Sequence, residues 1–427
     1  MYIKEIENIA DYDVVIVGAG ASGICAAVSA AQMGVSVAMV ERSATVGGGL
    51  TSGHVGPTMG RYESNTIAEK INKLIGCDKR LAQDFEVAKI RLTALVAESG
   101  IDVYLNTAIA DVVMEDDSVK NVIVATQSGL KSISGRIFVD ATGDGVLAYL
   151  CGEDYEIGRD DGLTQPVSIM FTIEGVSEDQ PLICRHEEMD TQLERGSYLD
   201  LCRAANASGE LPENVNIVRL SPTGNPCERM VNATQQNRVN GLSPIEYSRA
   251  QNELRNQMLC VVEFLKNNVE GFENIRIKDS SDGIGVRETR RIKGKYTLTA
   301  EDLIESRRFD DVVVHNAAFP IDIHNPSGAG QAESKGCPVQ VSGYDIPYRS
   351  LVPNKTENLY LSGRCISGTH RAHASYRVMN IAMNIGEAVG VGAALCVKGG
   401  KTPNSLDVKE VQRELSKRGI ELFKTNE

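Results

Sequence analysis

The chain has 427 residues, and its 57 acidic residues outnumber its 44 basic ones, which gives a formal net charge of −13. At roughly 150 residues per domain, this length allows two or three domains. The acidic excess argues against nucleic acid as a partner, because such binding needs cations that replace the counterions of the phosphates. The hydrophobic fraction of 42% and the charged fraction of 24% are ordinary for globular proteins and exclude a disordered or fibrous chain.

The ten cysteines are scattered along the chain, with no Cys-x-x-Cys pair and no spacing typical of zinc ligands. We expect most of them to be buried, reduced thiols, and we predict no metal site. The first thirteen residues mix acidic and apolar side chains and lack the basic-then-apolar order of a signal peptide. We therefore predict a cytoplasmic protein.

Residues 14–40 form the first segment with a clear pattern, 27 residues without a charge. The segment is long enough for a membrane helix, but it is rich in Gly, Ala and Ser and changes its periodicity twice, which argues against a membrane span. Tyr12–Val17 is a β-branched run typical of a strand buried in a parallel sheet. Ala21–Met33 then indicates a helix ended by Gly34, and Val35–Val40 indicates the next strand. The segment therefore predicts one βαβ unit.

Further elements follow from the patterns downstream. Residues 102–140 alternate apolar and polar side chains between charged turns, which predicts a strand followed by a β-meander. Ser243-Pro244-Ile245-Glu246 is typical of a capping box and predicts a helix that ends near Asn267. The remaining expected elements are a polar helix after Thr299, a strand over Asn358–Ser362 and a nearly uncharged helix over Val378–Val397.

Gly18-Ala19-Gly20-Ala21-Ser22-Gly23 is a Gly-x-Gly-x-x-Gly motif between the first strand and its helix. The first glycine would make the tight turn, the second would let a pyrophosphate approach, and the third would let helix and strand pack closely. The helix N-terminus would offer its free N–H groups to the phosphates. Glu41 ends the second strand 18 residues after Gly23, where its carboxylate could accept hydrogen bonds from ribose hydroxyls. These features together predict a dinucleotide site.

Either NAD or FAD would suit such a site, and four features favour FAD. Gly47-Gly48-Gly49 offers flexible backbone along which a second phosphate and a ribityl chain could run. The strand and meander over 102–140 are not part of a simple NAD domain. The meander ends in Asp140-Ala141-Thr142-Gly143-Asp144-Gly145, and the chain returns at Asn358–Arg364 before it enters the helix from Val378. We therefore predict FAD as the cofactor.

These segments resemble the flavoproteins of the glutathione-reductase-like superfamily, and more closely the FAD-dependent oxidoreductase family related to fumarate reductase and succinate dehydrogenase flavoproteins. The resemblance rests on VVIVGAGASG, ERSATVGGGL, DATGDGVLA, GRDDGLTQPVSIMF, GVRETRRIKGKYTLTAED, FPIDIH, IPYRSLVP and GRCISGTHRAHASYRVMNIAMNIGEAVGVGAAL. It implies an α/β fold in which a Rossmann-like FAD-binding domain, a parallel sheet plus β-meander, is interrupted by an α+β cap domain for the substrate. We expect the FAD-binding domain over residues 1–160, the cap over 161–334, and the second part of the FAD domain with a helical tail over 335–427. The irregular residues 176–235 would belong to the cap.

The resemblance also implies roles for individual residues. Arg42 would lie beside the adenosine ribose, Ile109 would contact adenine through its backbone, and Asp144 would belong to a second flavin motif. Gly363-Arg364 replaces the Gly-Asp or Gly-Glu of many relatives, so Arg364 could contact either cofactor or substrate. The predicted FAD-binding residues are Gly18, Gly20, Ala21, Ser22, Gly23, Glu41, Arg42, Gly48, Gly49, Leu50, Ile109, Ala141, Gly143, Asp144, Gly363, Arg364, Met379 and Asn380.

Two subclasses of flavoprotein do not fit the sequence. Flavin-disulfide reductases carry a Cys pair just after the Gly-Gly turn, and GGGLTSGHVG contains none. Covalent attachment in the fumarate reductase group uses a His shortly before the Gly-Gly turn, and Arg42–Val46 contains none. Because His54 follows the turn instead, we expect FAD to be bound non-covalently.

The candidates for substrate chemistry lie mostly in the last third of the chain. Thr369–Arg377 places two His and two Arg just before the helix expected to face the flavin. His suits proton transfer beside a hydride step, and Arg suits a bidentate grip on a carboxylate or hydroxylated substrate. Helix capping or ion pairing is the alternative, and Arg287 would either tie the domains together or reach a substrate anion. The candidate catalytic residues are His373, Arg377, His370, Arg371 and His324.

From these features we expect an oxidoreductase that passes a hydride between a small polar substrate and the flavin, in a direction that the sequence leaves open. Two alternatives also remain open. One is an FAD-binding electron-transfer subunit of a larger redox complex, and the other is a flavin-dependent lyase or hydratase without net redox change. We expect no membrane partner and leave open a redox partner or a homo-oligomer.

Overall fold

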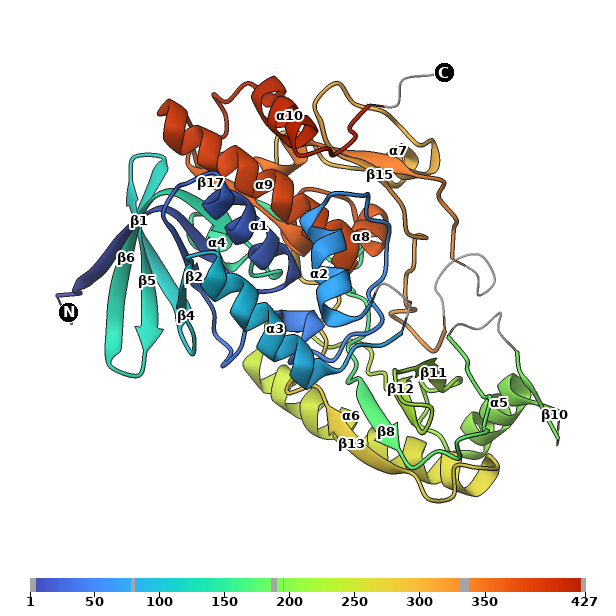
Figure 1. The fold of residues 1–427 in the computed structure, drawn as a ribbon. Helices are drawn as coiled ribbons and strands as arrows, with labels where there is room; N and C mark the ends of the chain where they lie inside the picture. The colour runs from blue at the N-terminus through green and yellow to red at the C-terminus, as the bar shows by residue number, and fades with distance from the viewer. Residues whose placement is uncertain (1–4, 78–80, 186–189, 195, 331–337, 424–427) are drawn as a thin grey trace.

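In the computed structural model, which describes residues 5–77, 81–185, 190–194, 196–330 and 338–423, a seven-stranded sheet lies in the larger part of the molecule (Figure 1). Its strands are β1 (Asn8–Val17), β2 (Val37–Val40), β3 (Asp102–Tyr104), β4 (Ala108–Glu115), β5 (Ser118–Thr126), β6 (Gly129–Asp140) and β17 (Leu359–Leu361). The strand order is β3-β2-β1-β6-β5-β4, and β17 also pairs with β6. β3, β2, β1, β6 and β17 run parallel, whereas β4 and β5 are antiparallel to their neighbours.

The predicted βαβ unit and meander are confirmed. The β-branched end of β1 is buried and pairs with both inner neighbours, because Val14 lies opposite Val37 on β2 and opposite Ile137 on β6. The last meander strand, β6, is therefore also a central strand of the parallel sheet. This arrangement joins the carboxyl ends of β1 and β6 at one edge, where ligands of open α/β sheets bind.

Two apolar helices pack on one another and on the sheet. They are α1 (Ala21–Gln32) and α9 (Met379–Gly399), which lie side by side in Figure 1. Close contact needs small residues: a Cβ at Gly386 would overlap the carbonyl oxygen of Ser22, and one at Gly390 would overlap that of Ala26. α9 is long and apolar enough to cross a membrane, but 89% of its most apolar window is buried inside the protein, as in a core helix.

The larger part of the molecule also contains further helices and two short strand pairs. The helix expected after Thr299 is confirmed as a short one, with a capping box between Thr299 and Asp302. β7 pairs with β14 and β15 with β16, both antiparallel. These elements are α2 (Ile67–Ile75), α3 (Phe85–Glu98), α4 (Val146–Leu150), β7 (Tyr155–Ile157), β14 (Arg290–Ile292), α7 (Ala300–Ile304), β15 (Val312–Ala317), β16 (Tyr344–Pro347), α8 (His370–Tyr376) and α10 (Val408–Lys417).

A second, smaller part carries an antiparallel sheet in the order β11-β12-β8-β13, at the lower right of Figure 1. The capping box predicted for its long helix, α6, is only half formed. Ser243 Oγ accepts from Glu246 N–H, but the Glu246 carboxylate accepts from Asn240 N–H at 2.9 Å instead. Its elements are β8 (Phe171–Glu174), β9 (Gln192–Leu193), β10 (Gly196–Ser197), α5 (Tyr198–Ser208), β11 (Arg219–Pro222), β12 (Glu228–Asn232), α6 (Pro244–Asn268) and β13 (Arg276–Ser280).

The two parts have separate hydrophobic cores. The smaller core is formed by residues between Val167 and Ile284, and the larger core takes residues from both flanks of that stretch. Ile292–Ile323 pack into the larger core, although the sequence assigns them to the cap domain. The domain limits stay a prediction, and the cores favour a return of the chain near residue 290 rather than 335.

Candidate active site

The glycines of the Gly-x-Gly-x-x-Gly loop have three different surroundings. Gly18 has a φ of +103°, and a Cβ there would overlap the carbonyl oxygen of Ala141 at the end of β6. A Cβ at Gly23 would overlap the carbonyl oxygen of Gly18, so helix and loop meet without a side chain between them. At Gly20, in contrast, a Cβ would meet no atom within 4 Å. The second glycine therefore leaves an open face above the loop, beside the start of α1.

Glu41 lies buried at the end of β2 and supports this loop from one side. Its Oε2 accepts from Ala19 N–H at 2.7 Å, and its Oε1 accepts from Ser43 N–H at 2.8 Å. Each oxygen keeps a lone pair for a further donor such as a ribose hydroxyl. Its backbone oxygen also accepts from Thr107 N–H, which places the start of β4, with Ile109, next to this corner.

The turn over Gly48–Leu50, a single 3-10 turn, closes against the loop. Gly47 donates its N–H to Ala19 O at 2.8 Å, and a Cβ at Gly48 would lie 3.1 Å from Gly20 Cα. A Cβ at Gly49 would lie 3.2 Å from Met379 Sδ at the N-terminus of α9. The glycine loop, the glycine turn and the start of α9 thus meet at one place, as the sequence predicts.

The return of the chain through β17 reaches the same place. Ser362 and Ser22 share a hydrogen bond between their Oγ atoms at 2.5 Å. Arg364 donates from Nη2 to Asp144 Oδ1 at 3.2 Å, and Thr289 Oγ1 donates to the same oxygen at 3.0 Å. Arg42 is 69% exposed and lies 3.9 Å from Asp144 Oδ2. Asp144 therefore connects the sheet edge with the return segment.

Asn380, a predicted cofactor-binding residue, makes several contacts with the protein itself. Its backbone N–H donates to Met59 O at 3.1 Å, and its Nδ2 donates to Gly60 O at 2.8 Å. Its Oδ1 accepts from Asn72 Nδ2 at 2.8 Å. These contacts tie α9 to the 59–60 loop and α2. One Nδ2–H and one lone pair of Oδ1 remain, so the role of Asn380 in cofactor binding stays a prediction.

A cluster of charged side chains lies where α8 meets the smaller part of the molecule. Arg377, the residue after α8, donates from Nη2 to Asp322 Oδ2 and to Asp322 O, each at 3.2 Å, and contacts Gln165 Oε1 at 3.5 Å. Arg287 donates from Nη1 to Pro166 O at 2.7 Å. Burial and, secondly, the charge of Arg377 lower the pKa of Arg287 to about 9. Two neighbouring guanidinium groups therefore repel one another in a poorly solvated place.

Two buried histidines beside these arginines are held neutral. Burial and the charge of Arg287 lower the pKa of His324 to about 4. Burial and the charges of Arg291 and Arg377 lower the pKa of His373 well below its ordinary value. His373 is 1% exposed, and its Nδ1 has no hydrogen-bond partner in the part of the chain that the structure describes. Both imidazoles are thus in the proton-accepting form at neutral pH.

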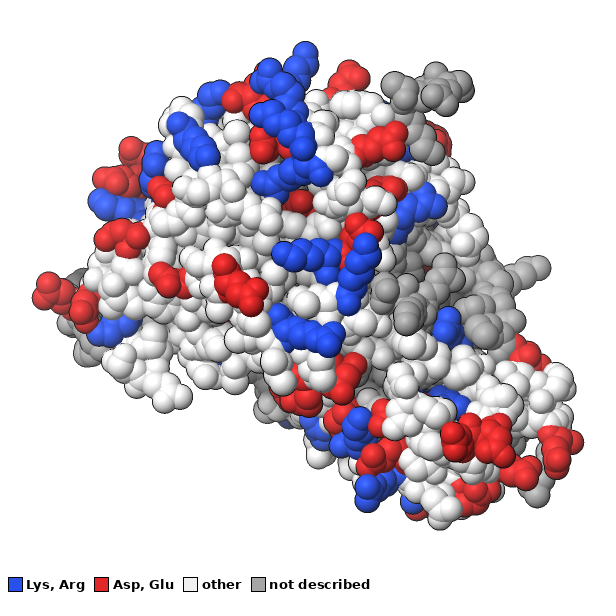
Figure 2. Space-filling model, in the orientation of Figure 1, with Lys and Arg blue, Asp and Glu red and all other residues white. Residues whose placement is uncertain are grey.

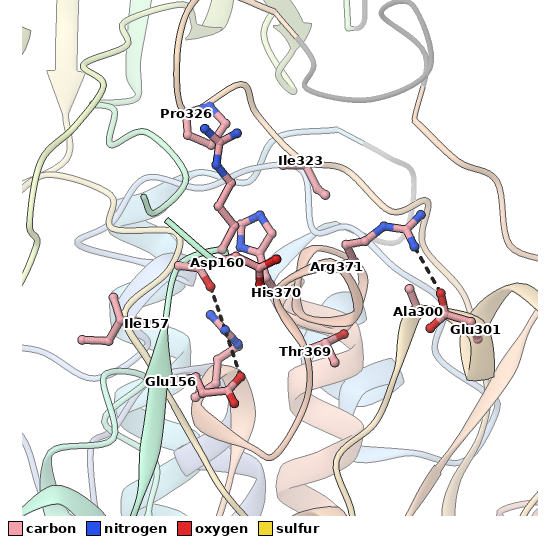
Figure 3. A pocket seen from close by; sticks show the side chains of 13 residues that line it. Glu156, Ile157, Asp160, Ala300, Glu301, Ile323, Pro326, Thr369, His370 and Arg371 are labelled. Carbon is pink, nitrogen blue, oxygen red and sulfur yellow. Dashed lines mark hydrogen bonds and ion pairs between the residues drawn. The ribbon is translucent and has the colours of Figure 1, made fainter. Parts of the chain in front are cut away.

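His370 and Arg371 lie elsewhere, on the wall of a cavity of about 620 Å³ shown in Figure 3. His370 Nδ1 lies 2.8 Å from Glu288 Oε1, which also pairs with Arg291. Arg371 Nη1 lies 3.3 Å from Glu301 Oε1. The lining of this cavity includes none of the predicted FAD-binding residues. His370 and Arg371 thus line this cavity, which is not lined by His373, Arg377 or His324. Glu288 links the two places, because its Oε1 lies 2.8 Å from His370 Nδ1 and its Oε2 accepts from Gln165 N–H at 3.1 Å.

The sequence prediction missed Gln165 and Asp322 and left Arg287 between two roles. Gln165 and Asp322 come from segments that the resemblance already contains, GRDDGLTQPVSIMF and FPIDIH, but nothing in either segment marks them as neighbours of Arg377. Cys365, a further residue near β17, is buried, and burial raises its pKa well above the ordinary value. Such a thiol is inert rather than redox-active.

Comparison with known proteins adds to this geometry. A family model described as FAD dependent oxidoreductase matches residues 13–415. Thiamine thiazole synthase from Methanococcus maripaludis (strain C5) is 27% identical over 150 residues, which is 32% of this chain and 58% of that protein. The enzyme of the same name from Pyrococcus horikoshii is 28% identical over 157 residues, 34% of this chain and 62% of that protein. The chain thus spans less than two thirds of these relatives.

Solved structures match a larger share of the chain. A geranylgeranyl bacteriochlorophyll reductase-like protein from Thermoplasma acidophilum aligns with a TM-score of 0.50 at 13% identity, over 97% of this chain and 84% of that chain. The flavin-dependent brominase Bmp2 aligns with a TM-score of 0.50 at 12% identity, over 95% of this chain and 83% of that chain. At such low identity the likeness concerns the fold alone.

Proposed function

Because the chain belongs to the FAD-dependent oxidoreductase family, we propose that it transfers a hydride between a small polar substrate and its non-covalently bound FAD. The observation that carries the proposal is the meeting of four segments at the carboxyl edge of the sheet. These segments are the glycine loop, the glycine turn, the end of β17 and the start of α9. The buried charged cluster beside α8 supplies candidate groups for substrate chemistry.

The residues at this edge fit FAD. The open face at Gly20 leaves room for a pyrophosphate, and the N-terminus of α1 carries no side-chain cap, so its first N–H groups are available to phosphate oxygens. Glu41 keeps lone pairs for ribose hydroxyls. Gly48–Leu50 and the backbone at Met379 would border the flavin ring, where the positive end of the α9 dipole would stabilise negative charge. These contacts with FAD are part of the proposal.

When bound, the flavin supplies the atom that accepts or donates the hydride. The protein's own part is to orient the substrate and to hold or accept a proton. We assign orientation to Arg377 and proton transfer to His373 Nδ1, which is neutral and lacks a protein partner among the described residues. A negative charge on a bound substrate would offset the nearby arginines and raise the pKa of His373, which would make it a better base.

Anaerobic reduction of the flavin tests the proposal. Purified protein should bind FAD, and one member of a panel of sugars, hydroxy acids and, with reduced enzyme, enoates should change the flavin absorbance within a single turnover. His373→Ala should abolish that change while it leaves FAD bound, and His373→Gln should give the same result with less change in packing. Protein that stays colourless after incubation with FAD would contradict the proposal.

Two other outcomes separate the alternatives. An electron-transfer subunit would show reduction only with a protein partner, and never with a small substrate alone. A flavin-dependent lyase or hydratase would turn over its substrate without any lasting change in the flavin spectrum.

A further inference from the structure

The cluster beside α8 contains more positive than negative charge. The charge of Asp322 acts on both Arg287 and Arg377, and the charge of Glu288 also acts on Arg377. A third guanidinium group, that of Arg219, adds positive charge beside Arg287. The other carboxylates nearby are already engaged, because Glu288 pairs with Arg291 and His370, and Asp144 pairs with Arg364. The two histidines of the cluster are neutral. In this poorly solvated place, guanidinium groups therefore outnumber the carboxylates that are left to pair with them, which favours an anionic ligand.

Surface charge does not explain this cluster. On the face shown in Figure 2, Lys and Arg gather at the top middle and Asp and Glu gather at the lower right, with both signs mixed elsewhere. The chain as a whole has a net charge of −13. An uncompensated positive charge inside an acidic protein is costly to fold, so it points to a ligand that neutralises it.

Unused hydrogen-bond donors lie in the same cluster. Gln165 is 1% exposed, and its Oε1 faces two donors, the N–H of His324 at 3.3 Å and Arg377 Nη2 at 3.5 Å. These contacts fix the orientation of the amide, so Nε2 must find an acceptor elsewhere. Neither Gln165 Nε2 nor Arg377 Nε has a partner in the described part of the chain. A buried donor without a partner destabilises a protein, and an acceptor on a ligand would satisfy both.

We propose that the substrate carries a carboxylate group, which binds between Arg287 and Arg377 and accepts a hydrogen bond from Gln165 Nε2. The inference rests on the proposed function and names the chemical class of its substrate. A carboxylate matches the planar guanidinium fork and supplies negative charge where guanidinium groups are in excess. Gln165 and Arg287 lie next to the smaller core, whereas Arg377 follows α8, so the bound carboxylate would also join the two parts of the site.

Binding of propionate and propionamide to the oxidised holoenzyme tests the proposal, with the visible flavin spectrum as the readout. The two probes have the same shape and differ in charge. Propionate should shift the flavin spectrum in a saturable way and raise the melting temperature, and propionamide should bind at least about 100-fold more weakly. Equal binding of the two probes, or competition by inorganic phosphate alone, would overturn the proposal.

Variants assign the effect to the arginines. Arg287→Met and Arg377→Met should each weaken propionate binding at least about 30-fold, while the FAD content per protein stays that of the wild type. Arg287→Lys and Arg377→Lys keep the charge without the fork and should retain partial binding, which also provides folded variants if the Met forms are unstable. Arg276→Met, which removes a 78%-exposed arginine from β13, serves as the control and should leave propionate binding unchanged.

The remaining outcomes separate the inference from the proposed function. Loss of FAD in the Arg287 and Arg377 variants, with folding intact, would assign the positive charge to the cofactor and overturn the inference. Propionate binding is measured without turnover. If no substrate reduced the flavin, the proposed function would be contradicted, but propionate binding would still test whether the site takes a carboxylate. In the apoprotein, an increase in melting temperature on addition of propionate would show carboxylate binding without the flavin.

Discussion

The two ends of the proposed active site are built in different ways. At the cofactor end, backbone atoms and glycines without side chains form the surface, and most of the residues lie within positions 18–49. At the substrate end, charged and amide side chains form the surface, and they come from positions 165, 287, 322 and 377. In the proposed site, a cofactor common to a whole family would thus be held by local backbone, whereas the group specific to one substrate would be held by side chains assembled from distant segments.

The largest expected effect separates two glycines of the cofactor end. Gly23→Ala should destabilise the protein by more than about 3 kcal/mol, because the new Cβ would overlap Gly18 O between loop and helix. Gly20→Ala should leave the melting temperature nearly unchanged, since its Cβ would enter open space, and should weaken FAD binding at least tenfold. Thermal denaturation of the apoproteins and flavin titration measure the two effects. Equal loss of stability in both variants would contradict this division.

The next effect concerns the substrate end and its pH dependence. The pKa of His324 is about 4 in the folded protein and about 6.5 when unfolded, so between these values the unfolded chain binds more protons. Stability is therefore lost as the pH falls from about 6.5 to about 4, by about 3 kcal/mol from this residue. Denaturant unfolding at pH 7 and pH 4 should show a smaller loss for His324→Gln than for the wild type. Equal losses would show that His324 does not resist protonation.

A smaller effect tests Glu41, a charged side chain that supports the glycine loop. Glu41→Gln keeps the shape but offers only one acceptor to the two N–H groups of Ala19 and Ser43. We expect FAD affinity to fall tenfold to hundredfold, which corresponds to about 1–3 kcal/mol for the unpaired donor. Flavin titration measures the change. Glu305→Gln, which alters a 62%-exposed carboxylate in a surface ion pair, is the matched control and should bind FAD like the wild type.

The smallest effect is expected at Arg42. Its side chain is 69% exposed and lies 3.9 Å from Asp144, so the ion pair should contribute less than about 1 kcal/mol. Arg42→Gln should therefore change FAD affinity less than tenfold in a flavin titration. A hundredfold loss would show that Arg42 contacts the cofactor directly and that side chains also matter at the cofactor end.

The elements of the FAD-binding part could be predicted because their signals are local. The run Val14–Val17, the spacing of the glycines and the capping residue Thr299 each act within a few positions of the chain. The residue at which the cap domain ends could not be predicted from such local signals. Residues 292–323 join the larger core through partners far away in the sequence, as when β15 pairs with β16.

The sequence by itself determined the βαβ unit, the glycine loop with Glu41 and the apolar helix that became α9, because strand burial, tight turns and apolar runs are written as short patterns. Only the tertiary structure decided which members of the Thr369–Arg377 run share a site. His370 and Arg371 line the cavity together with Glu301. His373 lies near Arg377, which itself lies beside Arg287 and Gln165. Charge balance in a buried cluster depends on such long-range contacts, which no single segment encodes.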